Sequence, residues 1–146
     1  IIEIPNRRGR AILGMLCIVP QRSLQRETVS KLIWPARFKP QARASLRQCL
    51  HELNRELRAH DLDILQTSNT HIALSSEGVQ TDVCALESAL SNQDVTRAIV
   101  FLAQTTCQRI LADVRLGEQL ESWLSFQRLH LESRLRLTAN QFLADL

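Results

Sequence analysis

The sequence is poor in aromatic and in conformationally special residues. Of its 146 residues, aromatics make up 4%, Tyr is absent, and Gly and Pro number four each. So few aromatic rings argue against binding of single-stranded nucleic acid by base stacking. No phosphate-binding glycine loop, serine-hydrolase elbow or zinc-protease motif occurs in the chain. The sequence therefore argues against an enzyme, and it predicts no cofactor.

Paired cysteine motifs are missing as well. The four cysteines, Cys17, Cys49, Cys84 and Cys107, are widely spaced and form no CxxC pair. His51 lies two residues from Cys49, a spacing that points the two side chains to different faces of a helix, so no metal site is expected. A chain with this many leucines needs no disulfides for stability. We therefore expect buried free thiols and a reducing, cytoplasmic location.

Long apolar runs are missing too. The segment RRGRAILGMLCIVPQ imitates the start of a secretion signal, since a basic cluster precedes about nine apolar residues. No small-residue cleavage site follows, and the run falls far short of the roughly 18 residues that a membrane-spanning helix needs. We expect a buried helix here and no membrane partner. Because the chain begins without Met, we also expect a fragment of a longer protein.

Charge, in contrast, is present and unevenly distributed. Residues 1–58 carry 12 Arg and Lys against 4 Asp and Glu, whereas residues 59–146 carry 6 against 11. A basic first part joined to an acidic second part indicates that the first part faces a polyanion.

Apolar spacing predicts three helices and a hairpin in the first part of the chain. The helices are expected at residues 7–19, from an N-cap at Ser23 to Trp34, and at residues 40–58. Short alternating runs then predict a hairpin at residues 64–74, with an added strand at 79–83 as a further possibility.

The remaining segments are expected to be mainly helical. Helical patterns cover residues 82–90, 94–111 and 117–146, with apolar rows on more than one side, which suits stacked helical hairpins. They are consistent with a dimerisation module or with a platform for a regulatory partner. Residues 1–4 look like the end of a strand, and we expect Trp34 and Trp123 in the core.

The predicted helix at residues 40–58 carries two stripes. Its apolar residues gather on one face about 100° wide, the width of a core-facing stripe: Ala42, Leu46, Cys49, Leu50, Leu53 and Leu57. Its cations and two other polar residues follow a neighbouring stripe: Arg43, Arg47, His51, Asn54 and Arg58. The acids Glu52 and Glu56 lie on the far side. Such separation of positive from negative side chains on one helix indicates that the cationic stripe binds an anionic partner.

Two segments resemble a known family. LIWP, four further residues and PQARASLRQCLHELNREL, followed by the hairpin and TDVCALESAL, resemble the DNA-binding domain of the antibiotic regulatory protein (SARP) type of bacterial transcription activators. Those domains look like the OmpR winged helix. ESWLSFQRLHLESRLRL is similar to the start of the bacterial transcriptional activator domain, whose helices resemble tetratricopeptide (TPR) repeats. The resemblance implies a mainly α protein with a small β hairpin: a winged helix-turn-helix at residues 1–82, then TPR-like helical hairpins at residues 83–146.

The resemblance also implies a function. Such a protein binds double-stranded DNA sequence-specifically and regulates transcription, with the helix at residues 40–58 in the major groove and the hairpin at 64–74 as the wing. The loop at residues 34–39 is the part that in OmpR-like activators can touch RNA polymerase. Similar activators place protomers on repeated sites, so a homodimer on DNA is expected as well.

Site residues follow from this interpretation. The candidates for bases or the groove are Arg43, Arg47, His51, Asn54 and Arg58; Arg47 suits guanine and Asn54 suits adenine. The candidates for phosphates are Arg22, Lys31, Arg37, Lys39, Arg55 and Thr70. The alternative is a regulatory scaffold without DNA affinity that uses the basic stripe to hold an acidic protein. Such a scaffold would bind one polypeptide tightly, and any residual association with DNA would depend only weakly on salt.

Overall fold

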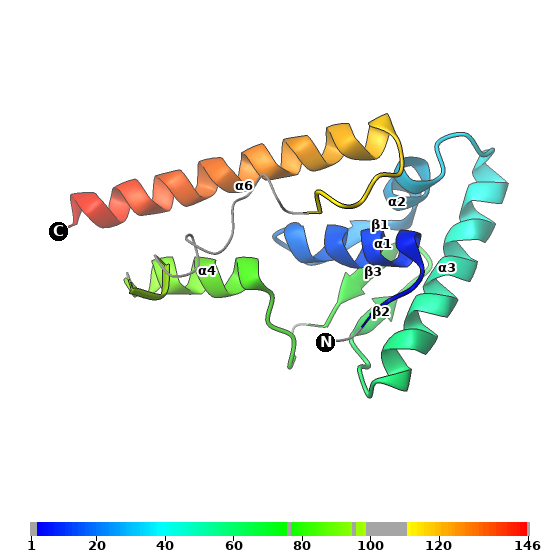
Figure 1. The fold of residues 1–146 in the computed structure, drawn as a ribbon, viewed down its shortest axis with the longest axis horizontal. Coiled ribbons are helices and arrows are strands. Elements are labelled where there is room, and N and C mark those ends of the chain that lie inside the picture. Colours follow the sequence, from blue (N-terminus) through cyan, green and yellow to red (C-terminus); the bar gives the residue numbers. More distant parts are fainter. Residues whose placement is uncertain (1–2, 76, 95, 99–110, 146) are drawn as a thin grey trace.

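The computed structural model describes residues 3–75, 77–94, 96–98 and 111–145. Its helices and strands follow one another as α1 (Arg7–Ile18), β1 (Ser23–Gln25), α2 (Arg26–Ile33), α3 (Lys39–Ala59), β2 (Leu65–Thr67), β3 (His71–Leu74), α4 (Asp82–Ser91) and α6 (Glu118–Ala144). The helix α3 stands at one end of the molecule, and the C-terminal end of α6 points away from it (Figure 1). The prediction of a mainly helical protein with a small hairpin is confirmed.

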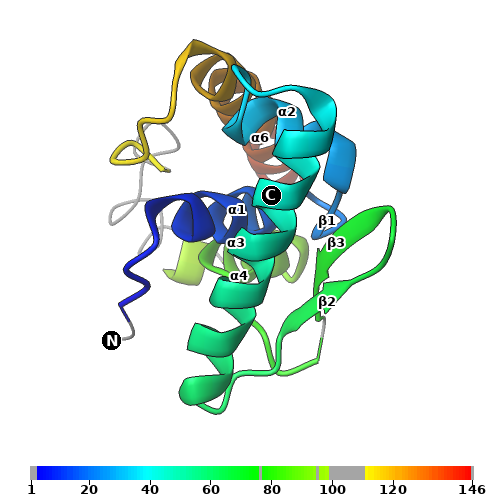
Figure 2. The same cartoon turned by 90° about the vertical axis from the view of Figure 1, so that its right-hand side faces the viewer.

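The three strands form one antiparallel sheet in the order β1-β3-β2. β2 and β3 pair as the predicted hairpin, with Leu65 opposite Leu74 and Thr67 opposite Ile72. β1 pairs on the other side of β3, from Ser23 opposite Ala73 to Gln25 opposite His71. The sheet lies beside α3, and the hairpin runs along that helix (Figure 2). The topology therefore places the hairpin turn close to α3.

The predicted N-cap at Ser23 and the predicted added strand at residues 79–83 were both wrong. Ser23 does not cap α2, because it pairs in β1 and the residue before the helix is Gln25. Pairing with β3 overrides the local capping preference of serine. The added strand is therefore β1 and not residues 79–83, which form a loop and the start of α4. At the start of the chain, residues 3 and 4 belong to no strand, while residues 1 and 2 lie outside the described residues.

The apolar stripe of α3 is buried as predicted. All six of its residues, Ala42, Leu46, Cys49, Leu50, Leu53 and Leu57, are buried. They pack in a core that also holds residues of α1, α2 and β3, among them Ile12, Val29 and Ile72. Because the leucines occupy the inner face, four residues of the second stripe, Arg43, Arg47, His51 and Arg58, are exposed, whereas Asn54 is half-buried.

Polar contacts also join α1 to α3. The side-chain oxygen of Asn6 caps α1 by accepting hydrogen bonds from the N–H groups of Arg8 and Gly9. Its Nδ2 donates to Glu52 Oε2 over 2.9 Å, and Gln48 Nε2 donates to Glu52 Oε1 over 2.9 Å. These two donors, first Gln48 and then Asn6, lower the pKa of Glu52. The acid predicted on the far side of α3 therefore fixes this helix to the start of α1.

The long helix α6 contributes to two clusters of buried residues. Leu120 and Leu124, near its start, belong to the core around α3, whereas Leu131 and Leu135 pack with residues of α4. Trp34 is buried in the first cluster, and the half-buried Trp123 contacts both. The domain boundary predicted at residue 82 stays a prediction. The helix α6 packs against residues before this boundary, in the core around α3, and against residues after it, in α4. Most of the helix predicted at residues 94–111 lies outside the described residues.

Candidate nucleic-acid interface

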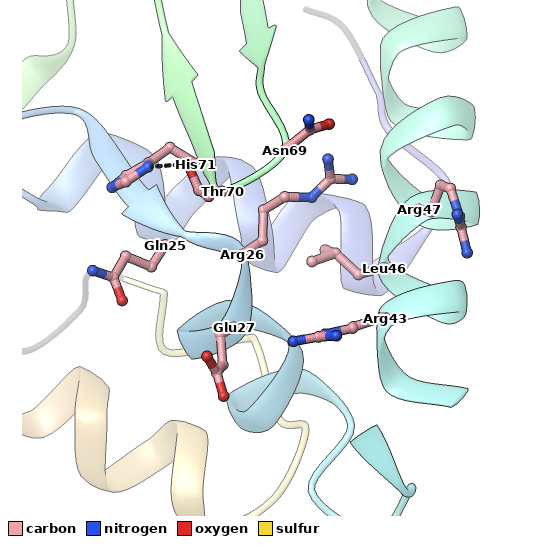
Figure 3. A pocket seen from close by; sticks show the side chains of 9 residues that line it. All are labelled: Gln25, Arg26, Glu27, Arg43, Leu46, Arg47, Asn69, Thr70 and His71. Carbon is pink, nitrogen blue, oxygen red and sulfur yellow. Dashed lines mark hydrogen bonds between the residues drawn. The ribbon is translucent and has the colours of Figure 1, made fainter. Parts of the chain in front are cut away.

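A basic groove lies between the first half of α3, the start of α2 and the hairpin turn (Figure 3). Its volume is about 700 Å³, and it is open to solvent. Nine residues line it: Gln25, Arg26, Glu27, Arg43, Leu46, Arg47, Asn69, Thr70 and His71. Three segments that are distant in the sequence therefore meet around one surface.

Three arginines give the basic groove its charge. Arg43 and Arg47 come from exposed positions on α3, one helical turn apart, and Arg26 begins α2. In Figure 3 the Arg43 side chain extends from α3 toward α2, and Arg26 extends toward Asn69 on the hairpin. Guanidinium groups are suited to phosphate oxygens and to the acceptor edge of guanine.

Glu27 is the single acid among the nine lining residues. Its Oε1 lies 2.8 Å from Lys39 Nζ and 3.4 Å from Lys31 Nζ. Hydrogen bonds from Lys39 and then Lys31 lower the pKa of this carboxyl, so it is ionised at neutral pH. Because two ammonium groups surround one carboxylate, the net charge around the basic groove stays positive.

The hairpin turn forms the uncharged wall of the basic groove. Residues 68–70 are exposed. The Ser68 hydroxyl oxygen accepts hydrogen bonds from the N–H groups of Thr70, at 3.3 Å, and His71, at 3.0 Å. Thr70 Oγ1 and His71 Nδ1 lie 2.8 Å apart in a further hydrogen bond. The turn is thus built from short polar side chains and offers hydrogen bonds rather than charge.

The residues of the second stripe of α3 do not all face the same surface. Arg43 and Arg47 line the basic groove, and His51 is exposed beyond it. Asn54 is half-buried, and its Oδ1 is buried with no hydrogen-bond partner among the described residues. Arg58 donates through Nε and Nη2 to Asp63 Oδ1, both over 3.2 Å. Within the described part of the chain, the arginines of the predicted stripe that have no protein partner are therefore Arg43 and Arg47, in its first half.

The residues predicted to meet phosphates fall into two groups. Four of them lie around the basic groove or the N-terminal end of α3: Lys31, Arg37, Lys39 and Thr70. Lys31 and Lys39 reach Glu27, Thr70 lines the groove, and Arg37 donates to the Ser45 hydroxyl of α3. Each of these contacts is at an exposed site, so water and ligand can compete for it.

Arg55 and Arg22 do not line the basic groove. Arg55 lies 3.7 Å from Glu56 at an exposed position in the second half of α3. Arg22 is half-buried, with Nη1 donating to the Val79 carbonyl over 2.8 Å and Nη2 donating to Cys84 Sγ over 3.0 Å. Arg22 therefore joins β1 to the segment around α4, and we leave it out of the interface proposed below.

Of the polar residues that line the groove, Arg43, Arg47 and Thr70 were predicted as site residues, and sequence reasoning missed the others: Gln25, Arg26, Glu27, Asn69 and His71. The predicted N-cap at Ser23 made Leu24 and Gln25 helical and gave no reason for Arg26 and Glu27 to face the hairpin. The unrecognised β1 instead ends at Gln25 and sets these two residues at the first turn of α2, opposite the hairpin. No local pattern signals this, since the pairing that creates it joins residues nearly 50 positions apart.

Three of the four cysteines are free thiols, and Cys107 lies outside the described residues. Cys49 is buried, whereas Cys17 and Cys84 are half-buried, so among the three described cysteines the expected burial holds only for Cys49. Burial raises the pKa of Cys49 to about 11, and the Glu52 charge adds to that rise. Burial, followed by the Asp82 charge, raises the pKa of Cys17 to about 11.

Alkylation by iodoacetamide is expected to be slow at Cys17 and Cys49. A thiol pKa raised from 9.0 to about 11 lowers the reactive thiolate fraction at neutral pH about 100-fold. Mass spectrometry of timed peptide digests measures both rates, with urea-unfolded protein as the reference. Equal rates for either cysteine in the folded and unfolded protein would contradict its burial.

Within residues 3–75, 77–94, 96–98 and 111–145, no group of three or more His, Cys, Asp and Glu side chains has an arrangement that would hold a metal ion. Over the same ranges, no helix is both long and apolar enough to cross a membrane. Comparisons of the whole chain with family profiles, curated proteins and solved structures gave no significant match. The basic groove therefore has to be interpreted from its own chemistry.

Proposed function

We propose that the protein binds double-stranded DNA sequence-specifically and regulates transcription, with the basic groove as its DNA-facing surface. The observation that carries the proposal is that Arg43 and Arg47 of α3 line one open groove, which Arg26 of α2 and an exposed hairpin turn complete. Arginines on a rigid helix serve both parts of DNA recognition, because they neutralise phosphates and read guanine.

The order of the elements supports a winged-helix interpretation. Three helices precede a hairpin, and the third helix carries cations on the surface that its leucines leave exposed. In a helix-turn-helix protein the N-terminal residues of the recognition helix contact base edges in the major groove. Arg43 and Arg47 lie in the first half of α3, where such contacts are expected. In this arrangement the hairpin turn meets the DNA backbone beside the major groove.

The resemblance to SARP-type activators extends the proposal to transcription. The surface that would recruit RNA polymerase is the loop between α2 and α3. Phe38 in this loop is 81% exposed, and Arg37 is also exposed. A bacterial activator of this kind works in the cytoplasm, contacts RNA polymerase through this loop and binds repeated sites as two protomers. Packing of α4 against α6 supports the TPR-like interpretation of the second part.

Selection from a random duplex library tests the sequence-specific part of the proposal. The wild-type protein should enrich one short motif over several rounds, and the Arg43→Ala/Arg47→Ala variant should enrich none. Binding without enrichment, equal for duplex DNA and heparin, would reduce the basic groove to a nonspecific cationic surface. Absence of duplex binding together with tight binding to an acidic polypeptide would favour the scaffold alternative.

Glu27→Gln is expected to strengthen DNA binding. The substitution removes the one acid of the basic groove and releases Lys31 and Lys39 for phosphates. At low salt the affinity for duplex DNA should rise roughly threefold to tenfold, as expected when exposed cations become available to phosphates. Fluorescence anisotropy with a labelled duplex measures the change.

Glu132→Gln on α6 is the matched control for Glu27→Gln. It removes the same charge and also releases a basic residue from an ion pair four positions away, that of Arg136. An equal gain of affinity in the two variants would mean that net charge alone is responsible, and the role given to Glu27 would be wrong.

A further inference from the structure

Arg26 connects the start of α2 to the hairpin turn by two hydrogen bonds. Its backbone N–H donates to the Thr70 carbonyl over 2.8 Å. Its Nη1 donates to the Ser68 carbonyl over 2.7 Å. The side chain extends along the basic groove toward Asn69 (Figure 3). One residue thus holds both sides of the turn.

The hairpin turn has little else that fixes it relative to the helices. The pairing of β1 with β3 ends at Gln25 and His71, and His71 is the residue that follows the turn. The other hydrogen bonds of the turn stay within the hairpin: the Ser68 hydroxyl oxygen accepts from the N–H groups of Thr70 and His71, and the Ser68 N–H donates to the His71 carbonyl over 2.9 Å. Its three residues, 68–70, are all exposed, so no apolar packing anchors them. Among the described residues, the two hydrogen bonds of Arg26 are therefore the polar contacts that tie residues 68–70 to α2.

We propose that Arg26 is a positioning residue for DNA recognition, which sets the place of the hairpin turn opposite Arg43 and Arg47. This inference rests on the proposed function, and it assigns Arg26 a role different from that of the two arginines on α3. Arg43 and Arg47 present their guanidinium groups to the DNA. The Arg26 guanidinium instead donates to the Ser68 carbonyl of the same protein. This bond lets Asn69 and Thr70 meet the DNA backbone at a fixed distance from α3.

The dependence of binding on salt distinguishes positioning from a direct phosphate contact. Each phosphate neutralised by a cation contributes about 0.9 to the slope of log affinity against log salt. Arg26→Ala should therefore weaken binding about fivefold, the effect of one hydrogen bond, at an unchanged slope. A slope reduced by about one would show instead that Arg26 contacts a phosphate.

A double-mutant cycle tests the link between Arg26 and the turn. Asn69→Ala should weaken binding in the wild-type background and have little further effect in the Arg26→Ala background, because the turn is already displaced. The matched control is Arg47→Ala, whose effect should add to that of Arg26→Ala. Full additivity of Asn69→Ala and Arg26→Ala would overturn the positioning role.

Backbone NMR relaxation of the DNA-free protein supplies a readout that is independent of binding. Loss of the Arg26 guanidinium should lower the order parameters of Asn69 and Thr70 while those of α3 stay unchanged. An ordered turn in Arg26→Ala would contradict the inference even if the affinity falls. If the wild-type protein binds no duplex DNA, the proposed function fails together with the inference, whereas additivity or a changed slope in a binding protein removes only the inference.

Discussion

Replacing Arg43 and Arg47 together by Ala is expected to weaken duplex binding by about 2 to 4 kcal/mol, a roughly 30- to 1,000-fold loss. Both side chains line the basic groove from exposed positions on α3, so their removal takes away the charge that the structure directs at a ligand. Ala is the better helix former, and the fold should therefore keep its stability. Fluorescence anisotropy with a labelled duplex gives the affinity, and a thermal melt checks the fold.

The double variant Arg97→Ala/Arg136→Ala is the control for that loss. It removes the same net charge at two arginines in ion pairs outside the basic groove, with Asp94 and with Glu132. Binding should fall less than threefold, as expected for exposed charges away from the interface. A comparable loss in both double variants would assign the affinity to overall charge, and the groove would have no special part in it.

Leu53→Ala is expected to lower the free energy of unfolding by about 2 to 5 kcal/mol, the usual cost of a cavity in a packed core. Leu53 is 0% exposed and packs close to Gly9 of α1, at the centre of the core behind the basic groove. Urea denaturation followed by the fluorescence of Trp34 and Trp123 measures the loss.

Leu129→Ala removes the same atoms from a side chain that is 64% exposed on α6. This control should change the free energy of unfolding by less than about 0.5 kcal/mol. A small effect at Leu53 would mean that the apolar stripe of α3 does not carry the packing that the structure assigns to it.

The helical half of the fold follows from local pattern. The 100° stripe of α3 predicted all six buried residues, because burial on a helix depends on a period that a sequence displays directly. The hairpin was predicted for the same reason, since its strands are adjacent in the sequence and joined by a short polar turn.

The basic groove is less readable from the sequence, because it depends on distant pairing. β1 is only three residues long, and it becomes a strand by pairing with β3 across nearly 50 positions. That pairing moves the start of α2 and brings Arg26 to the hairpin turn. Likewise, the spacing of the second stripe predicts neither the burial of Asn54 Oδ1 nor the hydrogen bond from Arg58 to Asp63. Helical periodicity places a side chain on a face, but tertiary contacts decide whether it is free to bind.

The salt dependence of duplex binding by the wild-type protein is the most direct test of the basic groove as a DNA-facing surface. Anisotropy titrations at several salt concentrations should give a straight line of log affinity against log salt. If Arg43, Arg47 and neighbouring lysines displace counterions from two to four phosphates, the slope should lie between about −2 and −4. A slope near zero, or no binding at low salt, would contradict DNA recognition by this surface.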